Sequence, residues 1–173
     1  MSGDGEFRNH ARMLECLYNE HYGQLVLWAD TILQDTDVAK DMVQEFFLRI
    51  WEKHLLVPLE ESALKSYCYI SIRNMALRKL KDKQRIQALD PSLIEEAWEE
   101  PDLEHEKMIE MLRQEIALLP QRSREVLECV HLKGMKYAEV ASRLGISVAT
   151  VKTLLVRSLK SLRDNIHGII LSR

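Results

Sequence analysis

The chain has 173 residues, of which 46% are hydrophobic and 29% charged, a composition typical of a globular protein of one or two domains. Its net charge is −3, and its apolar runs are shorter than the roughly 18 to 20 residues that span a bilayer, so we expect no membrane insertion. The start of the chain lacks a secretory signal pattern. Three widely spaced cysteines favour reduced thiols in a cytoplasmic protein over disulfides or a zinc site.

Three helices are predicted in the first half of the chain. Apolar side chains recur on one helical face across residues 10–33. The segment QDTDVAKD then offers capping residues and first-turn acids for a second helix, in which Phe47 and Trp51 widen the apolar face. This wide apolar face predicts that the second helix lies at the centre of a core and that Trp51 is a core residue. Pro58 interrupts the pattern, and a third helix is predicted from about Ser62 to the basic run RKLKDKQR.

An acidic segment separates the two halves. Residues 90–106 carry 8 acidic and no basic side chains, with two prolines and no clear period, which indicates a linker. A short acidic helix packed on a basic surface is the alternative. Residues 107–173 carry 12 basic and 6 acidic side chains, a balance that suits nucleic-acid binding. Because no strand-like alternation occurs, we predict an all-α fold of two small helical domains, at residues 10–87 and 107–173, joined by an acidic linker at residues 88–106.

The second half ends in a predicted helical hairpin. A helix beginning near Pro120 and ending at Gly134 leads into it. In the hairpin, Gly145 permits a left-handed backbone, Ile146 fills the corner and Ser147 caps the second helix. The predicted inward residues are Tyr137, Val140, Ala141 and Leu144 on the first helix, and Val148, Val151, Leu155, Leu159 and Leu162 on the second.

The outward side of the second helix is polar at its start and basic further along, which fits the major groove of DNA. Its predicted members are Ala149, Thr150, Lys152, Thr153, Val156, Arg157, Lys160 and Arg163. A generic amphipathic hairpin has the same periodicity, so the Gly-Ile-Ser turn followed by small and polar residues is the more specific signal.

These motifs resemble a known family. Residues 118–163, from LLPQRSREVL to LVRSLKSLR, resemble the fourth conserved region of sigma factors of bacterial RNA polymerase, most closely the extracytoplasmic-function (ECF) group. The segments DTDVAKDMVQEFFLRIWEKH and SYCYISIRNMALRKLKDKQR resemble the second conserved region of the same proteins. The order and spacing of these blocks agree over nearly the whole chain.

The resemblance implies three sets of binding residues. The first docks on a coiled coil of the polymerase β′ subunit and comprises Asp41, Gln44 and Glu45. The second binds the −10 promoter element as single-stranded DNA, beside a base-capturing loop in HLLVPLEESALKSY, and comprises Lys65, Arg73, Asn74, Arg78, Lys79 and Lys81. The third reads the duplex −35 element and comprises Ser147, Thr150, Lys152, Thr153 and Arg157.

Several residues keep two interpretations. The acids around Asp41 are, without the resemblance, a solvated stripe. Asn74 is as well suited to a helix cap or a core contact as to DNA binding. Tyr67 and Tyr69 are left between core and stacking roles. Leu154 stands where the family often has a basic or polar residue, and either packs on a neighbouring surface or touches a thymine methyl group.

The resemblance also implies the partners: core RNA polymerase, through its β′ coiled coil and β flap, promoter DNA, and an anti-sigma factor that is often membrane-anchored. We expect neither an enzyme nor a cofactor, because the histidines show no metal-ligand spacing and no glycine-rich phosphate loop occurs. Two rival interpretations are a dimeric DNA-binding regulator that uses only the hairpin, and a helical interaction protein with no DNA role.

Overall fold

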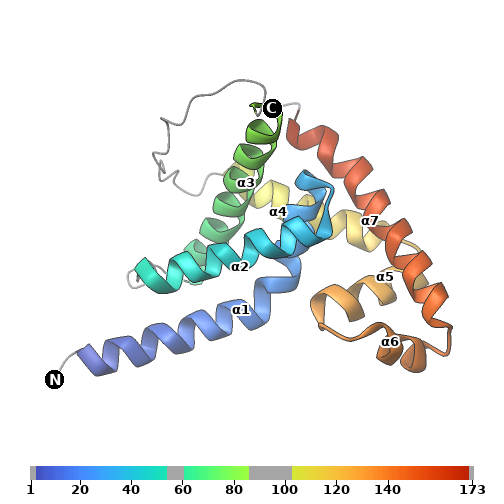
Figure 1. Ribbon diagram of the computed structural model, residues 1–173, viewed down its shortest axis with the longest axis horizontal. Helices are drawn as coiled ribbons and strands as arrows, with labels where there is room; N and C mark the ends of the chain where they lie inside the picture. Colours follow the sequence, from blue (N-terminus) through green and yellow to red (C-terminus); the bar gives the residue numbers. More distant parts are fainter. Residues whose placement is uncertain (1–2, 54–60, 86–102, 172–173) are drawn as a thin grey trace.

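The computed structural model describes residues 3–53, 61–85 and 103–171, and all regular structure in these stretches is helical, which confirms the predicted all-α class. The elements are α1 (Gly3–Leu33), α2 (Thr36–Lys53), α3 (Glu61–Arg85), α4 (Leu103–Leu118), α5 (Gln121–Leu127), the π-helical turn η1 (Glu128–Leu132), α6 (Tyr137–Leu144) and α7 (Val148–Leu171). Figure 1 shows α1 to α3 on one side, α5 and α6 on the other, and α7 rising from the hairpin across the molecule.

Two predicted segments lie outside the described residues: residues 54–60 of the base-capturing loop and residues 88–102 of the acidic linker. α4 begins at Leu103, inside the stretch predicted as linker. None of the helices in the described stretches is both long and apolar enough to cross a membrane.

The first helices are joined by specific polar contacts as well as apolar packing. Asp35 caps α2, because its Oδ1 accepts hydrogen bonds from the backbone nitrogens of Asp37 and Val38, each at 3.1 Å. Trp28 of α1 is 1% exposed, and its Nε1 donates to the carbonyl oxygen of Tyr69 in α3 at 3.1 Å. Tyr69 is therefore a core residue, and α1 and α3 are fixed to each other at this point.

The prediction that Trp51 lies in the core is wrong. Its side chain is 37% exposed, because it lies in the last turn of α2 and packs beside the ring of His10, with 6.1 Å between ring centroids. Periodicity alone placed it on the buried face, but the neighbouring helix covers that face only in part at the end of α2.

The two halves of the chain interlock through two hydrophobic clusters. The first cluster contains the apolar faces of α1, α2 and α3 together with Met108, Ile109 and Leu112 of α4, and the second contains those of α5, η1, α6 and α7. Leu27 of α1 belongs to the second cluster, and Ile166 of α7 belongs to the first. The predicted first and second domains therefore share a packed interface.

α1 and η1 approach each other closely at Gly23. A Cβ atom at this position would lie 1.8 Å from the backbone oxygen of His131 and 3.0 Å from the Cα of Leu132. Only a residue without a side chain allows two backbones to come this near. Gly23 is therefore a contact point between the halves of the chain and not only a weak helix residue.

We expect this interface to weaken in mild acid because of His131. Burial, followed by the charge of Lys40, lowers the pKa of this side chain to about 4, although Asp30 opposes the shift. The unfolded chain takes up a proton near pH 6.5 and the folded chain does not, so stability falls as pH drops below 6.5, by about 2 kcal/mol at pH 5. Urea unfolding at pH 7.5 and pH 5 measures this loss of stability. Between these two pH values the His131→Gln variant should lose about 2 kcal/mol less stability than the wild type. An equal pH effect in His131→Gln would assign the loss to other groups.

Candidate polymerase and promoter surfaces

The hairpin turn has the predicted geometry. Gly145 has a φ of 65°, in the left-handed region, and the nitrogen of Ile146 donates to the carbonyl oxygen of Ala141 at 3.0 Å. The Oγ of Ser147 accepts a hydrogen bond from the backbone nitrogen of Thr150 at 3.0 Å and so caps α7. Ile146 packs against the second hydrophobic cluster. The predictions for the turn are confirmed.

The predicted inward face of the hairpin is confirmed in its middle and wrong at its ends. The buried members are Val140, Ala141, Val151, Leu155, Leu159 and Leu162, and Leu144 is half-buried. Tyr137 and Val148 are 38% and 39% exposed. Each is the first residue of its helix, so it lies beyond the stretch that the partner helix covers.

Polar contacts tie the hairpin to the helices before it. Ser158 is buried, and its hydroxyl bonds the carbonyl oxygen of Ser123 in α5 at 3.2 Å. Arg124 donates to the carbonyl oxygen of Ala117 at 2.9 Å, which satisfies an end carbonyl of α4. Leu154 is half-buried against the second cluster, an observation that favours packing over a groove contact.

All five predicted −35 residues are exposed at the beginning of α7: Ser147, Thr150, Lys152, Thr153 and Arg157. Helical spacing puts Lys152, Thr153 and Arg157 on adjoining outward rows. The Oγ atoms of Ser147 and Thr150 lie 2.8 Å apart, so these hydroxyls hydrogen-bond to each other. The hydroxyl of Thr153 donates to a backbone oxygen in the turn before it at 3.0 Å, and its methyl group remains available.

Lys152 and Arg157 are exposed cations of this face, as is Lys160 further along the helix. Within the described residues neither takes part in an ion pair, in contrast to Arg122 and Arg163. Val156, 65% exposed, lies beside them and presents an apolar surface of the kind that contacts thymine methyl groups. The prediction that Arg163 points outward is wrong, because its side chain faces α1 and pairs with Asp30.

The six predicted −10 residues of α3 do not all share one side of the helix. At 100° per residue, Asn74, Arg78 and Lys81 lie together on one side of the helix, where Asn74 and Arg78 are half-buried and Lys81 is exposed. Tyr67, left open from the sequence, falls on the same side and is half-buried, with its ring 6.0 Å from that of Phe46. Ile70, 4% exposed, lies between Tyr67 and Asn74 on this side and separates the ring of Tyr67 from the three polar residues.

The other three predicted −10 residues are turned elsewhere. Helical spacing places Lys65 and Lys79 on the opposite side of α3, and Arg73 between the two sides. Lys65 is half-buried, and burial, followed by the charge of Arg113 in α4, lowers its pKa. Lys65 is therefore half-buried near the charge of Arg113, whereas Lys79 and Lys81 are exposed.

The predicted polymerase-binding residues are exposed on one side of α2. Asp41, Gln44 and Glu45 are all accessible, and Glu45 forms an ion pair with Arg49 at 2.6 Å. Leu48 lies one turn further along and is 58% exposed. An exposed leucine among acidic and amide groups is typical of a protein-binding surface.

Aromatic residues extend this α2 surface in a way that sequence patterns did not indicate. Trp51 continues the row of Leu48, and Tyr18 of α1, 37% exposed, packs edge-on against Phe47 with 5.0 Å between ring centroids. The Oη of the neighbouring Tyr22 lies 3.5 Å from the Nε2 of Gln44. The contribution of α1 depends on packing between helices, for which the sequence offers no local signal.

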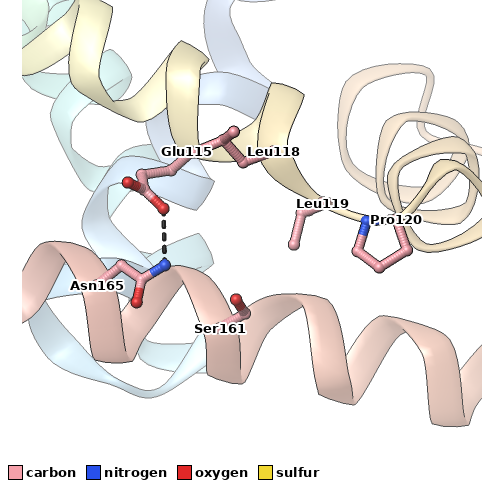
Figure 2. A pocket seen from close by; sticks show the side chains of 6 residues that line it. All are labelled: Glu115, Leu118, Leu119, Pro120, Ser161 and Asn165. Carbon is pink, nitrogen blue, oxygen red and sulfur yellow. Dashed lines mark hydrogen bonds between the residues drawn. The ribbon is translucent and has the colours of Figure 1, made fainter.

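A shallow pocket of about 460 Å³ lies where α4 meets α7, and Figure 2 shows the six side chains that line it. Asn165 donates to Glu115 Oε2 at 2.7 Å across it. The exposed Leu118 forms part of its rim. In the part of the chain that the structure describes, no group of acidic, histidine or cysteine side chains is arranged to hold a metal.

The chain matches two family models, one in each half of the sequence. Residues 17–86 match the family described as Sigma-70 region 2, and residues 109–162 match Sigma-70, region 4. The chain is 26% identical over 166 residues to the ECF RNA polymerase sigma factor SigL of Mycobacterium tuberculosis, covering 94% of both proteins. It is 28% identical over 153 residues to the ferric citrate uptake sigma factor FecI of Escherichia coli, covering 84% of this chain and 86% of FecI.

A third relative is the RNA polymerase sigma factor SigZ of Bacillus subtilis, 25% identical over 156 residues, with 90% of this chain and 88% of SigZ covered. Both conserved regions are thus present, in the same order and over nearly the full length of the relatives. The chain belongs to the ECF sigma factors of RNA polymerase, and it is a factor for promoter-specific transcription initiation, not an enzyme.

Proposed function

We propose that this sigma factor binds core RNA polymerase through α2 and directs it to promoters by contacting −10 DNA with α3 and −35 DNA with α7. The observation that carries the proposal is that the predicted −35 and polymerase-binding residues are exposed on α7 and α2, while three of the predicted −10 residues share one side of α3. The three surfaces lie on three different helices, so they are able to act on three separate targets.

The −35 assignment is supported by the form of the hairpin. Lys152 and Arg157 project from the first turns of α7 as free cations suited to phosphates or guanine edges, and Val156 lies between them. Ser147 and Thr150 lie at the helix N-terminus, where backbone N–H groups attract a phosphate.

The −10 assignment is supported by the polar residues that share one side of α3. Arg78 and Lys81 suit a single-stranded backbone, Asn74 suits a base edge, and the ring of Tyr67 suits base stacking. We propose these four as the principal −10 residues, with Lys79 and Arg73 at the margin. Lys65, half-buried near Arg113, fits a structural role better.

The polymerase assignment is supported by the α2 surface. We propose that Leu48 is its apolar centre, that Asp41, Gln44 and Glu45 form a polar rim toward the β′ coiled coil, and that the hairpin half meets the β flap. Apolar anchors ringed by polar groups usually carry most of an interface's binding energy. Regulation by an anti-sigma factor, membrane-anchored or not, and a cytoplasmic location follow from family membership and belong to the same proposal.

Reconstitution with core RNA polymerase and a pool of promoter fragments tests the function directly. The wild-type chain should form a complex and start transcripts, and Leu48→Asp should weaken polymerase binding about 30-fold, the effect of losing an interface anchor. Leu118→Asp is the matched control, since Leu118 is also exposed but lies at the α4–α7 pocket. A wild-type chain that forms no complex would refute the proposal, and equal losses in both variants would refute the assignment of Leu48.

A further inference from the structure

The outward side of α7 carries a row of exposed apolar groups near its beginning. Ala149, Thr153 and Val156 are all exposed, and Val156 has 65% of its side chain accessible. Their spacing of four and three residues puts them in one row on a helix. The hydroxyl of Thr153 donates to the carbonyl oxygen of Ala149 at 3.0 Å, so its polar atom is already engaged within the helix. We call Ala149, Thr153 and Val156 the α7 stripe.

Exposed cations lie on both sides of the α7 stripe. At 100° per residue, Lys152 lies about 70° to one side of the stripe and Arg157 about 70° to the other. Lys160 follows one turn beyond Val156 and ends the row. A helix in the major groove turns its central row toward base edges, while phosphate backbones lie along both sides of it. The apolar groups are therefore placed to face base pairs, and the two flanking cations are placed to face phosphates.

An apolar row at the centre of such a face selects base pairs by one chemical group. Thymine is the base that presents an apolar group in the major groove, its C5 methyl, and alanine and the threonine methyl are among the usual partners of that group. The other groups on the base edges are hydrogen-bond donors and acceptors, which lose water without gaining a partner against an apolar side chain. From Ala149 to Val156 the stripe is ~10 Å long, which corresponds to about three base pairs at ~3.4 Å each.

A single exposed valine is ordinary on a protein surface. Three apolar groups in one row between two cations have a pattern that matches a groove with methyl groups along its floor. We propose that the α7 stripe reads thymine methyl groups, and that apolar contact with A·T pairs is the main source of −35 specificity in this chain. The inference rests on the proposed −35 surface and adds the chemical group that this surface recognises. Lys152 and Arg157 then supply affinity through phosphates, and the stripe supplies discrimination.

Exchange of thymine for uracil tests the proposal, because it removes the methyl group and leaves every hydrogen-bonding atom of the base in place. The chain, assembled with core RNA polymerase, first selects promoter fragments from a pool with a randomised −35 segment. Uracil then replaces thymine at one A·T pair of the selected element at a time. Affinity should fall about fourfold at one to three neighbouring pairs, the loss expected for one methyl-sized apolar group, and should stay the same at the others.

Val156→Ala should make the protein less sensitive to this exchange. The side chain is exposed and alanine favours a helix, so the variant should fold. Because the methyl group has lost its partner, the penalty for uracil at the facing pair should shrink from about fourfold to about twofold or less. The slope of log affinity against log salt should not change, since no phosphate contact is removed. Val148→Ala is the matched control: it removes the same atoms from the same helix, about 80° away from Val156, and should keep the full penalty.

Thr153 separates methyl contact from hydrogen bonding to DNA. Thr153→Val keeps a methyl group and removes the hydroxyl, whereas Thr153→Ser keeps the hydroxyl and removes the methyl group. Thr153→Val should bind the selected fragment as tightly as the wild type, and Thr153→Ser about fourfold more weakly. The opposite order would assign the reading to the hydroxyl group and contradict the proposal.

The outcomes separate this inference from the proposed function. A chain that selects and binds promoters, but has equal affinity for thymine and uracil at every −35 position, would overturn the role of the α7 stripe and leave the proposed function standing. Selection of a −35 element that contains no A·T pair would do the same. A chain that binds no promoter fragment in the presence of core RNA polymerase would refute the proposed function, and the reading of thymine methyl groups with it.

Discussion

Gly23→Ala is expected to lower the free energy of unfolding by about 2 kcal/mol, even though alanine usually stabilises a helix relative to glycine by about 1 kcal/mol. The added Cβ would lie 1.8 Å from the oxygen and 2.7 Å from the carbon of the His131 carbonyl. Both are backbone atoms, which cannot rotate away as a side chain does. α1 and η1 must therefore move apart, and part of the interface between the halves is lost.

Thermal or urea unfolding measures this effect, and Gly168→Ala on α7 is the matched control. A Cβ at Gly168 meets no atom within 4 Å, so the same substitution there should be neutral or stabilising. If Gly23→Ala is as stable as Gly168→Ala, the close approach of α1 to η1 does not exist in solution.

Lys152→Ala and Arg157→Ala are expected to weaken duplex binding by α7 about 5- to 150-fold each, the usual cost of about 1 to 3 kcal/mol for a lost groove contact. Each cation that contacts a phosphate should also reduce the slope of log affinity against log salt by about 0.9. The measurement is a salt titration with a promoter fragment selected in the reconstituted system.

Lys107→Ala supplies the control, because Lys107 is equally exposed and carries the same charge but lies on α4. Its loss should reduce affinity only through the small change in net charge. If Lys107→Ala matches the two α7 variants, the binding reports overall charge and the assignment of the reading face is wrong.

Local features of the structure were predictable from the sequence wherever the physical cause is local. The turn at Gly145, the cap at Ser147 and the starts of α2 and α3 each depend on a few neighbouring residues, and they lie where predicted. The middle of each amphipathic face was predictable for the same reason, since burial at i, i+3 and i+4 follows from the helical period.

The failures come from contacts between residues that are distant in the sequence. Arg163 has an outward position in the hairpin taken alone, but its partner Asp30 lies 133 residues earlier on a helix that periodicity cannot place. Trp51 and Tyr18 depend in the same way on how far α1 and α2 cover each other. The residues assigned from resemblance lie on α2, α3 and α7, and how far each is exposed could be seen only from the packing.

The ion pair between Asp30 of α1 and Arg163 of α7 also constrains how such a chain can evolve. An aspartate enclosed at position 30 is tolerable only while a cation at position 163 meets it, and an arginine at position 163 gains little over other polar residues without that aspartate. Substitution at one position thus favours a compensating substitution at the other. Among relatives that keep this packing of α7 on α1, the identities of these two positions should be correlated, and lineages that lost the pair should show it lost at both ends.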